Sequence, residues 1–308
     1  MNDIHQTPRL TREELLGYAA LLMAIVLFST IEVAVKMIQE TIPPLRLAAI
    51  RFILTGLILL LPAARQLAMR QHPFTWADAG VLIGLGLVGV TLAISFYHTA
   101  LHYLQANVGA IVFSANPVFV AVFAPKLLGE KMTGRRMIAM ALGLAGIAVL
   151  ALNRGTGGSG WVRGILLMTV AQAAFALYSV LSRKYMPRFG AIVITAFAGL
   201  IGGALILLLS WATEGYPFVA LSLKTWGRLF YITIVATVIP YLLFFYGLVQ
   251  TGAARGSMFF FLKPVLASAF AYAVLRETLT SGMIAGAALI VGALAMTVIP
   301  ERRITIPD

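Results

Sequence analysis

Long apolar segments, separated by short polar gaps, follow one another along almost the entire chain. A helix needs about 20 apolar residues to cross the hydrocarbon core of a bilayer, and on that measure the pattern predicts an all-α integral membrane protein. A transmembrane β-barrel is excluded, because the segments are continuously apolar and do not alternate. The ten predicted transmembrane helices are residues 17–38, 45–62, 78–97, 105–127, 135–152, 164–185, 190–211, 227–249, 254–275 and 279–299.

The apolar pattern repeats after 147 residues, most clearly where a polar residue precedes a proline. Asn116-Pro117 in the fourth predicted helix corresponds to Lys263-Pro264 in the ninth. Each repeat holds five helices, an odd number, so the second repeat must enter the membrane from the opposite side, which predicts inverted repeats. The same offset relates Gly17 to Gly164, Phe28 to Phe175, Lys36 to Arg183, Gly56 to Gly203, Gly109 to Gly256, Glu130 to Glu277 and Thr133 to Thr280. Around the third and eighth helices the offset slips slightly, with Trp76 matching Trp226 and Tyr97 matching Tyr246.

A glycine- and serine-rich linker, residues 153–160, divides the two halves. We expect a cytoplasmic segment at 1–16, the first repeat at 17–152, a linker at 153–163, the second repeat at 164–299 and a cytoplasmic tail at 300–308. With the N-terminus inside, the predicted cytoplasmic segments hold fourteen Lys and Arg residues and the outer segments hold seven. Lys and Arg are enriched in cytoplasmic loops, so both termini are predicted to be cytoplasmic and the linker to be exposed outside.

The composition supports a location in the cell (inner) membrane. Hydrophobic residues make up 60% of the chain and charged residues 11%, and the mean hydropathy is +0.94, whereas a soluble domain carries roughly 25% charged residues. The net charge of +12 would suggest nucleic acid for a soluble protein, but here the basic residues lie in short gaps between apolar segments, where anionic headgroups are the expected partners. The absence of cysteine excludes disulfides and thiolate chemistry.

Charged residues within the predicted helices are the strongest functional signal, because a charge at the bilayer centre costs at least about 2.5–3.5 kcal/mol. They are Glu32, Arg51 and Lys263, with Asn116 in the place of Lys263 in the first repeat. Glu32 and Arg51 lie at similar depth, so Glu32 is either the ion-pair partner of Arg51 or a proton-titrating or substrate-binding carboxylate. In the first case Arg51 is structural.

Lys263 stands near the middle of its helix, directly before Pro264, where proline opens the backbone. With Arg51 beside Glu32, Lys263 has no evident acidic partner, and we expect it to bind a negative group of a substrate. The competing possibility is that Glu32 neutralises Lys263 directly and that Arg51 faces the headgroups. Pro117 and Pro264 are expected to bend or open their helices and to act as hinges.

Other polar residues are expected to have structural roles. Glu130 and Glu277 each lie three residues before a threonine that can cap the next helix, and we interpret them as turn residues. His98 and His102 are placed at the membrane interface, with a weaker ligand-like alternative. Phosphate-binding and zinc-protease motifs are absent from the sequence, and neither cofactor nor metal is predicted.

Taken together, Pro117-Val-Phe with Leu-Gly-Glu130-Lys-Met-Thr133, and Pro264-Val-Leu with Leu-Arg-Glu277-Thr-Leu-Thr280, resemble the EamA-type family of the drug/metabolite transporter superfamily. The resemblance covers both repeats. It implies a ten-helix transporter of small metabolites, with a central cavity formed by the first, third, fourth, sixth, eighth and ninth helices. The residues that it nominates for substrate binding are Ser29, Glu32, Tyr97, Asn116, Gln172, Tyr178, Tyr241 and Lys263.

We therefore expect a secondary transporter that moves a small organic metabolite by alternating access. An amino acid or a related zwitterionic or anionic solute is favoured because of Lys263, and export is favoured by family analogy. The sequence contains no ATP-binding motif, so uphill transport would use a proton, another coupling ion or a partner. The alternative is an intramembrane enzyme acting on a lipid-linked substrate, which would need a cluster of acid, base or metal-binding residues that the sequence does not offer.

Overall fold

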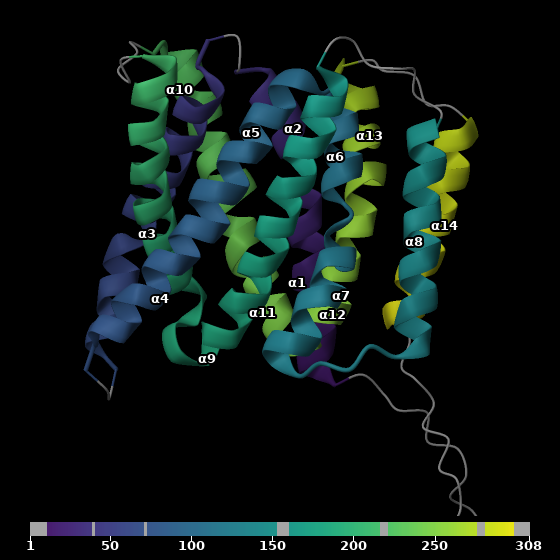
Figure 1. The fold of residues 1–308 in the computed structure, drawn as a ribbon, viewed down its shortest axis with the longest axis horizontal. Coiled ribbons are helices and arrows are strands. Elements are labelled where there is room, and N and C mark those ends of the chain that lie inside the picture. The colour runs from purple at the N-terminus through teal and green to yellow at the C-terminus, as the bar shows by residue number, and fades with distance from the viewer. Residues whose placement is uncertain are drawn as a thin grey trace, which may run out of the picture.

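The computed structural model describes residues 11–38, 41–70, 73–152, 160–215, 221–275 and 281–298, and every regular element within these ranges is a helix (Figure 1). Residues 153–159 of the predicted linker, Glu277 and Thr280 lie outside them, whereas residues 161–163 of that linker form the start of a helix. The α-helices are α1 (Arg12–Phe28), α2 (Ile31–Lys36), α3 (Pro44–Ala68), α4 (Trp76–Gly86), α5 (Ala93–Tyr103), α6 (Ala106–Phe113), α7 (Asn116–Leu128), α8 (Gly134–Leu152), α9 (Trp161–Glu214), α10 (Leu223–Phe230), α11 (Ile239–Thr251), α12 (Ala253–Ser257), α13 (Lys263–Leu275) and α14 (Ser281–Val298). Two π-helices, η1 (Leu87–Leu92) and η2 (Tyr231–Val238), and one 3₁₀ helix, η3 (Met258–Leu262), complete the described elements.

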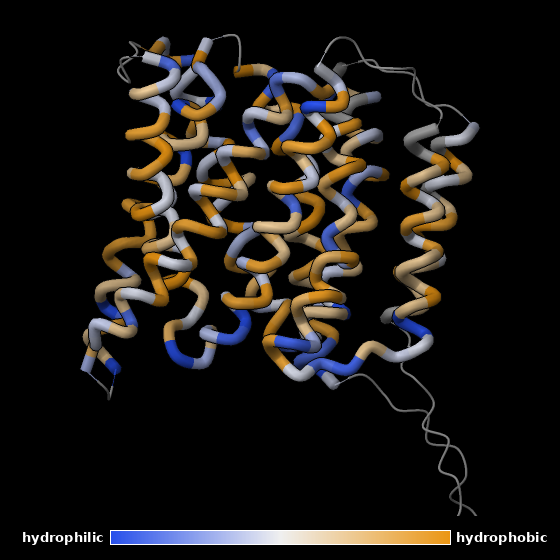
Figure 2. Tube along the Cα trace, viewed as in Figure 1, coloured by the Kyte–Doolittle hydropathy of each residue, from blue (hydrophilic) through white to orange (hydrophobic). Residues whose placement is uncertain are grey.

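Seven of the described helical stretches are long and apolar enough to cross a membrane. One of them, α9, has 54 residues and consists of two helices that meet at Gly190, where φ is 75° and ψ is 163°. A side chain would be strained in that conformation, so glycine allows the chain to turn back there. Apolar residues follow the helices through the middle of the molecule, and the polar ones gather at the helix ends (Figure 2). The helical membrane fold is confirmed, and the total of ten crossings stays a prediction.

The two halves pack through small residues that correspond in the repeat. Helix α3 lies against the second limb of α9, after Gly190. A Cβ atom on Gly56 would lie 2.8 Å from the backbone nitrogen of Leu200, and one on Gly203 would lie 2.8 Å from the backbone nitrogen of Ile53. Small residues let helix backbones approach closely in membranes. The glycine of each repeat thus packs against the corresponding position of the other repeat. A two-fold relation between the halves requires such a pair of equivalent contacts.

Helices of both halves are interrupted inside the molecule. The first span breaks between α1 and α2, and the fourth breaks at Ser114 and Ala115, between α6 and α7. The ninth span changes to 3₁₀ geometry in η3, and the third and eighth contain the π-helices η1 and η2. Non-helical backbone at membrane depth is tolerated only where protein or a cavity surrounds it. The interruptions before Pro117 and Pro264 agree with the predicted opening of these helices; their action as hinges is a proposal.

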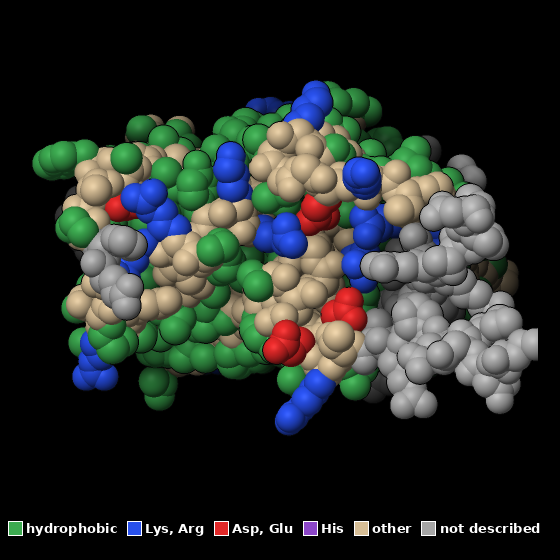
Figure 3. All heavy atoms as spheres, turned by 90° about the horizontal axis from the view of Figure 1, so that it is seen from below, with side chains coloured by type: hydrophobic (Ala, Val, Ile, Leu, Met, Phe, Trp, Pro, Cys, Tyr) green, Lys and Arg blue, Asp and Glu red, His purple; other side chains and the backbone are tan. Residues whose placement is uncertain are grey.

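The described chain begins and ends on one face of the molecule, the lower face in Figure 1, where α1 starts and α14 ends. Lys and Arg side chains gather on this face (Figure 3). They come mainly from the end of α7, the start of α8, the bend of α9 and α12. Helices α8 and α14 lie side by side at one edge of the bundle (Figure 1), and a Cβ on Gly146 would lie 2.8 Å from the carbonyl oxygen of Gly286.

Candidate functional site

Two interrupted helices carry opposite charges into the centre of the molecule. After α1 ends at Phe28, a short turn leads into α2, and Glu32 lies in the first turn of that helix. The hydroxyl of Ser29 donates to the carbonyl of Ile25 at 2.7 Å, and that of Thr30 donates to the carbonyl of Leu27 at 2.8 Å, so these side chains add to the backbone hydrogen bonds of the turn. Lys263 begins α13, directly after η3.

Glu32 and Lys263 form an ion pair across the interface of the two repeats. The Lys263 Nζ atom lies 2.5 Å from Oε1 of Glu32, and both side chains are buried, with exposures of 2% and 0%. The hydroxyl of Tyr97, from α5, donates to the same carboxylate oxygen at 2.7 Å. Ser29 donates to the carbonyl of Lys263 at 3.5 Å. The expectation that Lys263 lacks an acidic partner is therefore wrong, and the competing possibility, that Glu32 neutralises Lys263 directly, is the one observed.

Arg51 lies in the same buried region, and neither of the two positions predicted for it is correct. It does not form the proposed ion pair with Glu32, and it does not face the headgroups, because only 2% of its surface is exposed. Its Nε and Nη1 atoms are buried without a hydrogen-bond partner. The guanidinium carbon lies 4.6 Å from the ring centroid of Phe52, a cation–π contact.

A small cavity of about 30 Å³ lies beside these charges. Ligand pockets usually measure about 300–1,000 Å³, so the cavity in this conformation is too small for an organic solute. Aromatic rings dominate its wall, and Lys263 Nζ lies 4.5 Å from the ring centroid of Phe113. The cavity is lined by Phe28, Ile31, Arg51, Ile94, Tyr97, Phe113, Phe175, Tyr241, Phe260 and Lys263.

The other nominated residues lie around this centre. Tyr241 lines the cavity, and Tyr178 packs beside it with ring centroids 6.5 Å apart. With the Gln172 amide turned so that its oxygen faces Asn116, that oxygen accepts from the backbone nitrogen of Asn116 at 3.1 Å and from Nδ2 at 2.6 Å, and the amide nitrogen donates to Phe113. Asn116 and Gln172 thus bind each other at the break in the fourth span.

Sequence reasoning missed the aromatic wall. Phe28, Phe113, Phe175 and Phe260 carry no signal of their own in a chain that is 60% hydrophobic. The correspondence of Phe28 with Phe175 after 147 residues was a usable hint, because both rings line the cavity and come from corresponding helices of the two repeats.

Of the two described histidines, His98 lies inside the protein and His102 lies at its surface, so they do not form a ligand pair. His98 is completely buried and neither ring nitrogen has a hydrogen-bond partner, so it does not face the headgroups, whereas His102 is exposed; the depth of both residues in the membrane stays a prediction. Among the described residues no group of three or more His, Cys, Asp or Glu side chains is arranged to hold a metal ion.

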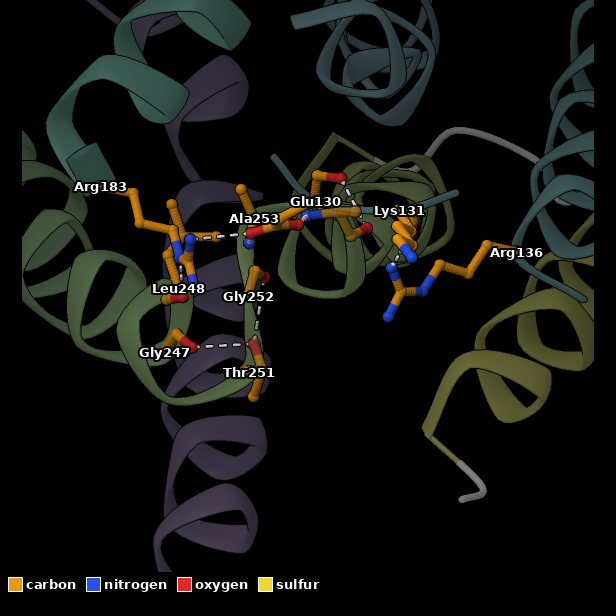
Figure 4. Close-up of polar contacts among 11 residues, drawn as sticks. Glu130, Lys131, Arg136, Arg183, Gly247, Leu248, Thr251, Gly252 and Ala253 are labelled. Atoms are coloured by element: carbon orange, nitrogen blue, oxygen red, sulfur yellow. Dashed lines mark hydrogen bonds and ion pairs between the residues drawn. The ribbon is translucent and has the colours of Figure 1, made fainter. Parts of the chain in front are cut away.

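Glu130 connects the two repeats at the lower face (Figure 4). Its carboxylate accepts hydrogen bonds from the backbone nitrogens of Ala253 and Ala254, both at 2.9 Å, at the start of α12. It also forms an ion pair with Arg183 of α9 at 2.8 Å, and Arg183 in turn donates to the carbonyl of Leu248. We call Glu130, Arg183, Ala253 and Ala254 the Glu130 cluster. The predicted capping by Thr133 is present as a 3.4 Å bond to the backbone of Arg136.

Comparison with known proteins identifies the class. A family model described as the EamA-like transporter family matches residues 15–152 and 162–299. An uncharacterized transporter of Clostridium kluyveri is 27% identical over 281 residues, covering 89% of this chain and 90% of that protein. A probable amino-acid metabolite efflux pump of Salmonella typhimurium is 28% identical over 295 residues, covering 93% and 95%. A solved crystal structure with 23% identity has a TM-score of 0.75 and covers 97% of this chain and 100% of that one, which supports the fold.

The helical fold, its interrupted spans and the charged centre between two repeats define a membrane transport protein. The chain belongs to the EamA-like transporter family, because the family model matches most of its length. The prediction of a transporter rather than an enzyme is confirmed by the family and by these relatives. As such it acts on a small molecule within a lipid bilayer.

Proposed function

We propose that this protein is a secondary transporter of the cell (inner) membrane that moves an amino acid or a related zwitterionic or anionic metabolite by alternating access. Ten crossings, with α9 counted as two spans and α8 and α14 as one each, would leave both termini on the same side, which we assign to the cytoplasm from the distribution of Lys and Arg. The observation that carries the proposal is the buried charged centre, where Lys263 of one repeat binds Glu32 of the other beside an aromatic cavity.

The small size of the cavity supports movement of the two repeats relative to each other. A solute of amino-acid size cannot occupy about 30 Å³, so the helices around Glu32 and Lys263 must separate to admit it. The interruptions before Pro117 and Pro264 provide points at which the two helices can bend. Lys263, Glu32, Tyr97 and Tyr241 would then line the opened site, with Asn116, Gln172, Ser29 and Tyr178 at its edge.

The name of the Salmonella relative, an amino-acid metabolite efflux pump, agrees with this substrate class and with export. A gradient of protons or of another ion would drive uphill movement, and Glu32, a buried carboxylate in contact with a tyrosine and a lysine, is the group we assign to respond to a coupling proton.

Counterflow in proteoliposomes tests the proposal. Vesicles that contain the purified protein and an unlabelled amino-acid mixture should transiently accumulate labelled amino acids from outside, whereas protein-free vesicles should not. Absence of counterflow for amino acids and for organic acids and amines, with protein that is folded and inserted, would reject the transport function.

A further inference from the structure

The buried centre contains two cations and one carboxylate. Glu32, Lys263 and Arg51 are all at least 98% buried, and Glu32 is bound to Lys263. The other described carboxylates with ion-pair or capping contacts bind elsewhere, at the ends of the helices: Glu14 to Arg255, Asp78 to Arg188, Glu130 to Arg183 and Glu214 to the start of α3. Within the described part of the chain, Arg51 therefore forms no ion pair with a carboxylate, and the buried carboxylate near it, Glu32, is already bound to Lys263.

An arginine keeps its charge under physiological conditions, because its guanidinium group cannot be deprotonated in proteins. Burying that charge without a counter-ion is costly, and one cation–π contact with Phe52 does not replace the lost water. Two of the three guanidinium nitrogens of Arg51, Nε and Nη1, lack hydrogen-bond partners. The planar group matches a carboxylate, with which it forms paired, charge-assisted hydrogen bonds. Arg51 also lines the cavity, so a solute in an enlarged cavity can reach it.

Glu32, in turn, has an acceptor without a hydrogen-bond donor. Its Oε1 atom accepts from both Lys263 and Tyr97, whereas its Oε2 atom is buried without a partner. Tyr97 and Lys263 line the same cavity as Arg51. The centre therefore offers unsatisfied donors on Arg51 and an unsatisfied acceptor on Glu32, surrounded by the rings of Phe28, Phe113 and other aromatic residues. A solute with a carboxylate, an adjacent hydrogen-bond donor and an apolar side chain satisfies all three features.

We propose that Arg51, rather than Lys263, binds the carboxylate of the transported solute, and that Oε2 of Glu32 accepts from the neighbouring ammonium or hydroxyl group. Lys263 and Tyr97 position Glu32 for this contact. This assigns the substrates to small monocarboxylic acids that carry an α-amino or α-hydroxy group and an apolar side chain. This inference rests on the proposed transport function only in that the bound acid is also the solute that is carried. Binding of the acid can be measured without a membrane.

The binding test uses the full-length protein in detergent and two series of ligands, one built on leucine and one on phenylalanine. Each series contains the amino acid, its α-hydroxy analogue, the acid without the α-substituent, and the amino-acid amide. The first two compounds of at least one series should raise the thermal unfolding temperature of the wild-type protein. The acid without a donor should bind more weakly, and the amide, which has lost the carboxylate charge, should have no measurable effect.

Arg51→Gln and Arg51→Met should weaken binding of the acids at least tenfold, and Arg51→Lys should recover part of it, because lysine keeps the charge without the planar fork. Removal of the uncompensated charge should also raise the unfolding temperature of the ligand-free protein. A variant that is more stable without ligand but binds the acids more weakly indicates that Arg51 binds the ligand, because loss of a structural residue would lower the stability. Arg65→Gln, an exposed arginine of the same helix α3, is the matched control and should change neither quantity.

The outcomes separate the two proposals. If Arg51→Met lowers the stability of the ligand-free protein and leaves the affinity for the acids unchanged, the carboxylate-binding role is wrong. It is equally wrong if the wild-type protein binds or carries the amides as well as the acids. If the acids bind through Arg51 but proteoliposomes show no counterflow of any solute, the binding inference stands and the transport function fails.

Discussion

Lys36 and Arg183, 147 residues apart in the sequence, make the same contact at opposite faces of the molecule. Lys36 Nζ donates to the carbonyl of Leu101 at 2.7 Å, and Arg183 Nε donates to the carbonyl of Leu248 at 2.8 Å. The two leucines are also 147 residues apart. In each case a basic residue at the end of one span binds the last turns of another span of the same repeat. The contacts follow the inverted symmetry expected for alternating access.

Glu130 adds a contact between repeats to the arrangement around Arg183. A carboxylate that accepts two backbone hydrogen bonds and faces an arginine is in a favourable position at the start of a helix. The Glu130 cluster therefore joins the end of α7, in the first repeat, to α9 and α12, in the second. We expect it to hold the lower face closed in this conformation.

Glu130→Gln should lower the free energy of unfolding by about 2 kcal/mol, because charge-assisted hydrogen bonds contribute roughly 1.5–3 kcal/mol. Thermal unfolding in detergent measures this loss. A cysteine at the buried Ser257, close to the cluster, should also react faster with a small thiol reagent in the Glu130→Gln background. Glu13→Gln, at an exposed position of the same face, is the control. Equal stability and equal reactivity in the two variants would show that the cluster does not close this face.

The sequence allowed the repeat, the helical membrane fold and the buried charged residues to be predicted, because each depends on hydropathy or on position along a helix. It did not decide whether Arg51 or Lys263 is the partner of Glu32. Depth along a span places Glu32 level with Arg51, but the rotation of each helix decides which side chains meet. Lys263 reaches Glu32 because α13 and α2 face each other across the interface of the repeats.

The match of Tyr97 with Tyr246 was also misleading. Tyr97 is buried at the charged centre, whereas Tyr246 is 41% exposed. Leu101 and Leu248, which accept the bonds from Lys36 and Arg183, keep the offset of 147 residues in these two spans. With that offset, Tyr97 corresponds to the buried Phe244. Both spans contain π-helical segments of different length, six and eight residues in η1 and η2. Such turns alter the register of side chains, and residue identity alone could not resolve the alignment.

Pro117→Ala and Pro264→Ala should leave the protein inserted but slow counterflow severalfold, because alanine supplies the missing backbone donor and makes the bend in the helix less favourable. Pro125→Ala is the matched control, since Pro125 lies inside α7 and away from the break. Initial rates in proteoliposomes at equal protein content provide the measurement. A hinge role is excluded if the three variants keep the wild-type rate, or if Pro125→Ala slows transport as much as the other two.

The predicted orientation can be tested directly, because the chain contains no cysteine. Leu223 and Met69 are 89% and 78% exposed and lie at the upper and lower ends of their helices. In intact cells an impermeant thiol reagent should label Leu223→Cys, and it should label Met69→Cys only after the membrane is permeabilised. Ser159→Cys, in the linker outside the described residues, is predicted to behave as Leu223→Cys does. The reverse pattern would invert the assignment of both faces.

The ion pair of Glu32 and Lys263 makes the most specific energetic prediction. Removing one member of a buried pair leaves an uncompensated charge and typically costs about 3–5 kcal/mol. Lys263→Met and Glu32→Gln should therefore each destabilise the protein by that amount, and the double variant should recover most of the loss. Thermal unfolding of the four proteins gives the coupling energy as a double-mutant cycle.

The more exposed pair of Glu14 and Arg255, with a separation of 3.6 Å, is the control for this cycle, because such pairs couple by no more than about 1 kcal/mol. Arg51 provides the competing outcome. If its guanidinium group can turn to Glu32 when Lys263 is removed, Lys263→Met alone will cost little and Lys263→Met with Arg51→Met will cost much more. That result would mean that the two cations are interchangeable partners of one carboxylate, and that the pair seen here is one of two arrangements available to the buried centre.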